Sequence, residues 1–148
     1  MPRLTPEELK AAKRRRAEER VAEERRISEE REMAAKRDAE RKAWLAEAKE
    51  GHKQLASAVE SLYTEVDKLA KKWPTMPVSQ LTLDRTNKAI RAVRKLLETE
   101  ANDFATDINE IVAAGDLPEH RDVLLILGEL RAALQRFKEK YQSEWGYS

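Results

Sequence analysis

The chain has 148 residues, of which 29 are Lys or Arg and 28 are Asp or Glu, and it contains no cysteine. The absence of cysteine excludes a disulfide framework, a cysteine-ligated zinc site and a thiol nucleophile, and it fits a reducing compartment. The longest apolar run, residues 123–127, is far shorter than the roughly 20 residues that span a bilayer, and Glu7 and Glu8 replace the basic or apolar start of a targeting peptide. We therefore expect a soluble, cytoplasmic protein that makes no membrane contact.

A helix start is predicted at Thr5, Pro6 and Glu8. The Thr5 hydroxyl and the Glu8 carboxylate can each accept from the other's backbone N–H, and Pro6 occupies the first helical position, where no amide is missed. The chain from there to Glu50 is almost wholly Ala, Glu, Lys and Arg, which favour helix. Opposite charges recur four residues apart, in Arg14 with Glu18, Arg15 with Glu19, Arg20 with Glu24, Arg26 with Glu30, Glu32 with Lys36, and Asp38 with Lys42.

This first helical stretch lacks an apolar stripe. Val21, Ile27 and Met33 are the only large aliphatic side chains between residues 10 and 42, and their spacing of six follows no single helix face. Such a helix buries little by itself, but its charge pairs allow it to stand in water without a partner. We predict that residues 1–44 form a charged, solvent-exposed helical arm.

The pattern changes at Leu45, where apolar positions begin to alternate in steps of three and four. The seam consists of Leu45, Ala48, His52, Leu55, Val59, Leu62, Val66, Leu69 and Trp73. Gly51 does not interrupt its phase, so one helix is predicted from about Pro6 to Trp73, where Pro74 ends it. Ala and Tyr residues flank the seam where a two-stranded coiled coil would place charges. This favours a helix inside a small bundle over a homodimer formed through the 45–73 seam.

Three further helices are predicted. The first covers residues 82–100 and has an apolar face of Leu83, Ile90, Val93 and Leu97. A short second helix is capped by Asn102 and Asp103, carries Phe104, Ile108, Ile111 and Val112, and ends at Gly115. The last begins with a cap at Asp116 and Pro118 and extends to about Ser143. Its run of residues 123–127 is apolar on all sides, which is typical of the middle of a bundle, and Gly128 would let a neighbouring helix approach closely.

The predicted fold is therefore all-α, with a long charged N-terminal helix continuing into a compact bundle of about four helices over residues 45–148. The predicted core consists of Leu62, Leu69, Ile90, Leu97, Leu124, Leu127, Leu134 and Phe137.

The two histidines suggest no catalytic or metal-binding chemistry. His52 lies on the seam, where a polar residue more often fixes register than binds a ligand. His120 lies at the start of the last predicted helix, where we expect an exposed polar cluster. Neither has a glutamate at the Glu-x-x-His spacing of helical di-metal sites, and no phosphate-binding glycine loop or nucleophile elbow is present. We expect no catalytic residue, no cofactor and no metal.

Basic residues are the feature that points towards a function. Residues 10–20 carry six bases against two acids, and a second group lies on the predicted helix 82–100. The candidate contacts to a nucleic acid or an acidic partner are Lys10, Lys13, Arg14, Arg15, Arg16, Arg20, Lys88, Arg91, Arg94 and Lys95. The same residues are also explained by an ordinary solvated helix surface.

Three functions remain open. The first is a non-enzymatic adaptor or accessory subunit that binds another protein through its bundle and its charged helix. The second is a nucleic-acid-binding helical subunit that contacts phosphates through residues 13–16 and the later bases. The third is a small metal-dependent helical hydrolase, which bound metal would support.

Overall fold

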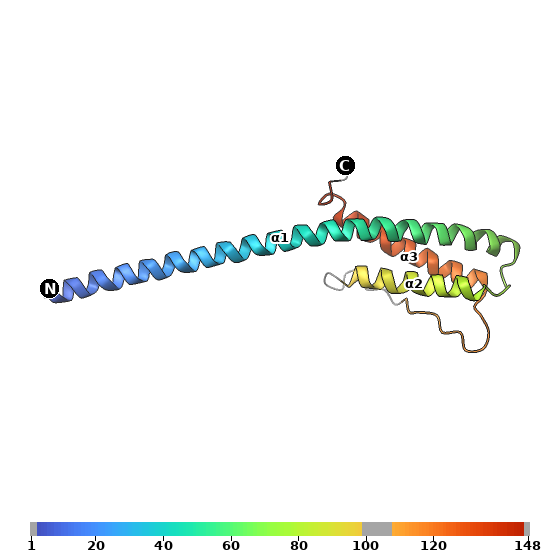
Figure 1. Ribbon diagram of the computed structural model, residues 1–148, viewed down its shortest axis with the longest axis horizontal. Helices are drawn as coiled ribbons and strands as arrows, with labels where there is room; N and C mark the ends of the chain where they lie inside the picture. Colours follow the sequence, from blue (N-terminus) through green and yellow to red (C-terminus); the bar gives the residue numbers. More distant parts are fainter. Residues whose placement is uncertain (1–2, 99–107, 147–148) are drawn as a thin grey trace. The chain divides into compact units, whose positions relative to one another are not determined.

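The computed structural model describes residues 3–98 and 108–146. This part of the chain contains three helices and no strand: α1 (Pro6–Lys72), α2 (Gln80–Leu97) and α3 (His120–Tyr141) (Figure 1). The predicted all-α fold is confirmed. The chain divides into two compact units, residues 1–44 and 45–148, and α1 contributes residues to both.

The first unit begins with the predicted capping box. The backbone N–H of Glu8 donates to Thr5 Oγ1 at 3.2 Å, and the backbone N–H of Thr5 donates to the Glu8 carboxylate at 3.2 Å. From residue 3 to residue 44 no side chain is buried, and the larger aliphatic residues Leu9, Val21, Ile27 and Met33 are exposed. Helix propensity, capping and charge pairs therefore hold this part of α1, with no contribution from a core.

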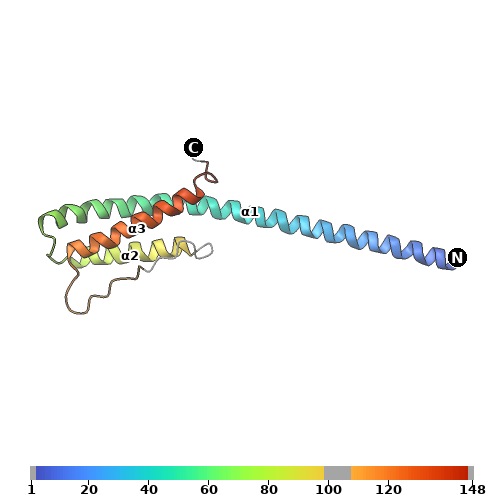
Figure 2. The ribbon, with the colours of Figure 1, turned by 180° about the vertical axis from the view of Figure 1, so that it is seen from behind.

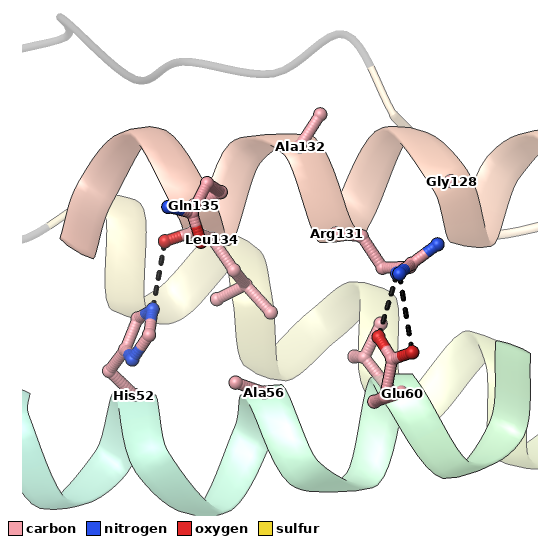
Figure 3. Close-up of a pocket in the computed structure, with 9 residues that line it drawn as sticks. His52, Ala56, Glu60, Gly128, Arg131, Ala132, Leu134 and Gln135 are labelled. Carbon is pink, nitrogen blue, oxygen red and sulfur yellow. Dashed lines mark hydrogen bonds and ion pairs between the residues drawn. The ribbon is translucent and has the colours of Figure 1, made fainter. Parts of the chain in front are cut away.

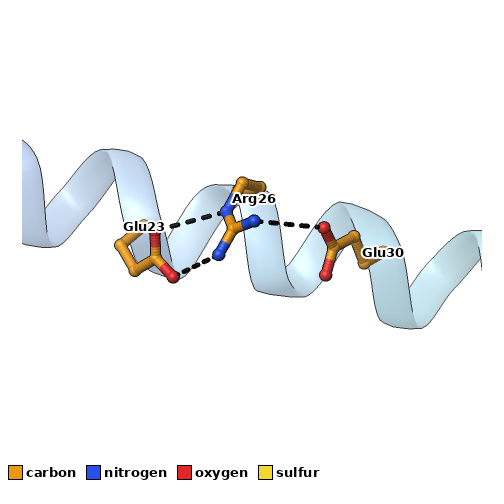
Figure 4. A network of polar contacts seen from close by, with 3 residues as sticks. All are labelled: Glu23, Arg26 and Glu30. Atoms are coloured by element: carbon orange, nitrogen blue, oxygen red, sulfur yellow. Dashed lines mark hydrogen bonds and ion pairs between the residues drawn. The ribbon is translucent and has the colours of Figure 1, made fainter.

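Figure 4 shows one of these charge networks. Arg26 Nε donates to Glu23 at 3.2 Å, and Arg26 Nη1 lies 3.5 Å from Glu30. The hydrogen bond from Arg26, together with its positive charge, lowers the pKa of the Glu23 carboxyl. Of the six predicted pairs, Arg26 with Glu30 and Asp38 with Lys42 form, and the other four form no ion pair in the described residues.

In the second unit, α2 and α3 both start beside the end of α1 and run back along it (Figures 1 and 2). Side chains join the helices at successive levels: Glu65 of α1 pairs with Arg85 of α2 at 3.0 Å, and Glu60 of α1 pairs with Arg131 of α3 at 2.7 Å. The helices α2 and α3 are therefore parallel to each other and antiparallel to the second half of α1.

The core of this unit lies between the three helices. Six of the eight predicted core residues are buried, namely Leu62, Ile90, Leu97, Leu127, Leu134 and Phe137, while Leu69 and Leu124 are half-buried. Most of the predicted seam is covered within the same chain, since Val59 and Val66 are fully buried. The exception is Trp73, which is 48% exposed because α1 ends one residue before it.

The start of α3 differs from the prediction. Asp116 does not cap the helix, which begins at His120, and the preceding Glu119 makes no side-chain capping bond. Instead, the connector after α1 supplies the acceptors: His120 N–H donates to the Met76 carbonyl at 3.0 Å, and Arg121 N–H donates to the Pro74 carbonyl at 3.1 Å. Tertiary contacts thus satisfy orphan donors that the sequence assigned to a local cap.

The predicted short helix between α2 and α3 is not found where the structure can test it. Its expected cap, Asn102 and Asp103, and its first apolar residue, Phe104, lie outside the described residues. Residues 108–113 are not helical, and Ile111 bonds through its backbone to Asn87 of α2. Gly115 has the expected positive φ of 101°, but it ends no helix. The described bundle therefore has three helices in place of about four.

The apolar run of residues 123–127 does not lie in the middle of the bundle. Val123 and Leu127 are fully buried, Leu124 and Ile126 are half-buried, and Leu125 is 69% exposed. In the second unit α3 packs against two helices, so its outer face meets solvent. The run behaves as one turn of an amphipathic helix.

Candidate functional site

The basic residues in the first unit lie on one stretch of α1. Lys10, Arg20 and the four consecutive bases of residues 13–16 are all exposed. Since each residue advances about 100° around an α-helix, four consecutive bases cover most of its circumference. None of these six residues forms an ion pair in the described residues, in contrast to Arg26 further along the helix (Figure 4). Their cationic groups are therefore free to bind an anionic partner.

The bases predicted on the next helix lie on α2, in the second unit, and they do not form one uniform group. Arg91 forms an ion pair with Glu110, and Arg94 Nη1 donates to Asn109 Oδ1 at 3.1 Å. Lys88 and Lys95 are exposed and form no ion pair in the described residues. Two of the four predicted contact residues on α2 are therefore already bound, by Glu110 and Asn109.

A groove of about 420 Å³ lies between the second half of α1 and α3 (Figure 3). Its lining includes the small residues Ala56, Gly128 and Ala132, with polar groups at its sides. Two contacts satisfy those groups: Arg131 binds Glu60 through two nitrogens, at 2.7 and 3.2 Å, and His52 Nε2 lies 2.8 Å from the Leu134 carbonyl oxygen. The polar groups of the groove are thus used to join the two helices, and they do not form an acid–base or nucleophilic set.

His52 is a buried structural residue, as the seam pattern indicates. Its ring stacks on Phe137 with ring centres 6.1 Å apart, and Trp145 lies against it at 5.5 Å. Burial lowers the pKa of His52 below its ordinary value, the hydrogen bond to the Leu134 carbonyl opposes this, and the charge of Lys138 adds to the lowering. A neutral imidazole that donates from Nε2 to the Leu134 carbonyl satisfies this geometry.

The expectation for His120 is wrong. Its side chain is 5% exposed, and its Nδ1 has no hydrogen-bond partner in the described residues. The connector explains the burial, because the backbone bond from His120 to Met76 holds the first turn of α3 against residues 74–78. Within the residues that the structure describes, His120 belongs to no group of three His, Cys, Asp or Glu side chains that could hold a metal ion.

Sequence reasoning missed three residues that organise the second unit: Glu60, Arg131 and Asn87. The first two are far apart in the sequence, and nothing in either local pattern joins them. Asn87 was overlooked because it is an uncharged residue on the polar side of a predicted amphipathic helix. One signal in the sequence could have predicted contacts between α2 and the chain after it. Residues 98–118 contain six acids and no base, and they directly follow the basic α2.

Two further features are absent from residues 3–98 and 108–146. No group of three His, Cys, Asp or Glu side chains there is arranged to hold a metal ion. No helix there combines the length and the apolar composition needed to cross a bilayer.

Comparison of the chain with protein-family models, with curated proteins and with solved structures finds no match.

Proposed function

We propose that this protein is a non-enzymatic helical adaptor or accessory subunit of a larger assembly. Its second unit docks on one partner, and the charged helix of the first unit binds another through the exposed bases of residues 10–20. The observation that carries this proposal is the absence of any buried side chain in residues 3–44, although residues 6–44 are helical throughout.

A helix without a burying face contributes no core to its own chain, so its side chains remain available for a partner. Charged surfaces of this kind speed up association with an oppositely charged partner and favour that partner over others. The second unit supplies the stable part of such a subunit, because it contains the buried core. The charged pair and the histidine in its groove contact residues of the neighbouring helix, which is why we propose binding in place of catalysis.

Nucleic-acid binding is the second candidate, and one observation favours it. The four consecutive bases of residues 13–16 are exposed and form no ion pair in the described residues, so phosphates would meet no internal competitor there. The α2 bases support it less, because Arg91 and Arg94 already bind Glu110 and Asn109.

The test compares three versions of the intact protein. The first is unchanged, the second carries Arg14→Gln, Arg15→Gln and Arg16→Gln, and the third carries Arg25→Gln, Arg31→Gln and Arg37→Gln. Both triple variants lose three positive charges from exposed positions of α1, but only the variant at residues 14–16 loses consecutive ones. Partners captured with the unchanged protein are purified, and their affinity for all three versions is measured alongside that of a mixed-sequence oligonucleotide.

If the adaptor proposal holds, the variant at residues 14–16 loses affinity for a protein partner, and the variant at residues 25, 31 and 37 keeps most of it. The oligonucleotide then binds weakly to all three versions. If phosphates are the target, oligonucleotide affinity falls and the slope of log affinity against log salt flattens by up to about three units. Equal affinity of all three versions both for every captured protein and for the oligonucleotide would contradict both candidates.

A further inference from the structure

Residues 109–111 contact α2 through Asn87, Arg91 and Arg94. We name residues 108–112 the strap. Asn87 of α2 binds Ile111 of the strap through both atoms of its amide: Nδ2 donates to the Ile111 carbonyl at 2.9 Å, and Oδ1 accepts from the Ile111 N–H at 2.7 Å. A side-chain amide that pairs with both backbone groups of one residue recognises peptide backbone without regard to the side chain it carries.

Two arginines extend this recognition along the same helix face. Arg91 forms an ion pair with Glu110, and Arg94 donates to Asn109 at 3.1 Å. Positions 87, 91 and 94 are spaced by four and three residues and therefore share one face of α2. They contact residues 111, 110 and 109 in that order, so the strap runs antiparallel to the helix. We name these three α2 residues the clamp.

Most of the strap lies at the surface of the second unit. Ile108 is buried, but Val112 is 87% exposed, and the side chains of the Arg91–Glu110 pair are 60% and 41% exposed. Exposed ion pairs stabilise a fold weakly. Lys88 and Lys95 on α2 are exposed and form no ion pair in the described residues, so α2 offers more positive charge than Glu110 neutralises.

We propose that the clamp is a docking site for an extended acidic peptide of a partner protein, and that the strap is its internal competitor. This rests on the proposed adaptor function and names the docking face of its second unit. The strap itself shows which chemistry fits: an extended backbone at Asn87 and an acidic side chain at Arg91. A nucleic-acid backbone fits less well, because phosphates offer only acceptors, whereas Asn87 also uses its carbonyl oxygen to accept from an N–H.

The experiment uses the intact protein and a fluorescent peptide with the sequence of residues 108–113, Ile-Asn-Glu-Ile-Val-Ala. An attached strap competes at a high effective concentration, so the unchanged protein should bind the peptide weakly. Glu110→Gln, alone or with Asn109→Ala, removes strap contacts and leaves the clamp intact. Because the lost ion pair is exposed, Glu110→Gln alone should bind the peptide about two- to fivefold more tightly than the unchanged protein, and the double variant more tightly still.

Adding Asn87→Ala or Arg91→Gln to the Glu110→Gln variant should abolish that gain, as should replacing the peptide's Glu by Lys. Arg85→Gln is the matched control. This substitution removes the same positive charge from α2, but Arg85 pairs with Glu65 of α1 and lies outside the clamp. The gain should survive this control substitution.

Three results would overturn the proposal. The first is no peptide binding to any version, and the second is an oligonucleotide that binds the Glu110→Gln variant while the peptide does not. The third is loss of helical circular dichroism in Glu110→Gln itself, which would make the strap a structural part of the bundle. Each is independent of the triple arginine variants in residues 14–16, so this proposal and the adaptor proposal can fail separately.

Discussion

The imidazole Nε2 of His52 lies 2.8 Å from the carbonyl oxygen of Leu134, a residue 82 positions later in the sequence. This contact joins the second half of α1 to α3, and the stacking of His52 on Phe137 extends it. The hydrogen-bonding need of a polar residue on an apolar seam is therefore met by a backbone acceptor on the neighbouring helix. This specific hydrogen bond helps to fix the register of the two helices.

The stability of the second unit should depend on pH through His52. Because burial lowers its pKa in the folded protein, the unfolded chain takes up the proton first as the pH falls below about 6.5. The free energy of unfolding should therefore be constant above that pH, decrease below it, and level off below the lowered pKa of the folded state. Urea unfolding at several pH values checks this. In His52→Gln the decrease should be smaller, and equal pH dependence in both proteins would contradict the assignment.

Replacing Leu127 by Ala should destabilise the second unit strongly, whereas replacing Leu125 by Ala should destabilise it weakly. Leu127 is fully buried and Leu125 is 69% exposed, although both belong to the same apolar run. Leu127→Ala should lower the free energy of unfolding by about 2 to 5 kcal/mol, because it removes buried methyl groups and leaves a cavity. Leu125→Ala is the matched control and should change it by less than about 0.5 kcal/mol. Chemical denaturation of both variants measures the difference, and similar losses would show that the outer face of α3 is covered.

Alanine substitutions at two glycines should have opposite effects. Gly115 has a φ of 101°, which strains any residue with a Cβ, so Gly115→Ala should destabilise the protein by about 1 kcal/mol or more. Gly128 lies inside α3, and a Cβ there would meet Tyr63 at 3.8 Å, an ordinary contact. Gly128→Ala should therefore stabilise the protein by up to about 1 kcal/mol through helix propensity. Thermal unfolding compares the two, and a destabilising Gly128→Ala would mean that the approach of Tyr63 requires glycine.

Removing residues 1–40 should leave the second unit folded. No residue from 3 to 44 is buried, so the truncation removes no buried side chain that the structure describes. The melting temperature of the remaining helices should barely move, while the helical signal falls in proportion to the residues removed. Hydrogen exchange on the full chain should show the first unit as the least protected helical stretch. A truncated protein that is molten or insoluble would contradict this.

The sequence by itself determined the presence of α1, α2 and α3 and the contrast between the two halves of α1. Local terms set the start of the helix at the Thr5–Glu8 capping box, and the heptad pattern placed Val59, Leu62 and Val66 in the core. The exposure of the basic residues on α1 followed for the same reason, because a stretch without an apolar stripe has nothing to bury.

Only the tertiary structure decided how many helices pack and which polar groups meet. Three packed helices leave the outer face of α3 exposed at Leu125, a position that the apolar run placed inside. Contacts between distant residues also took the place of local ones. The carbonyls of Pro74 and Met76 accept from the first N–H groups of α3, where a cap at Asp116 was predicted. Asn87 bonds to the backbone of Ile111, which is not helical. Sequence patterns report what neighbouring residues prefer, whereas a backbone group in the folded chain takes whichever hydrogen-bond partner packing brings within reach.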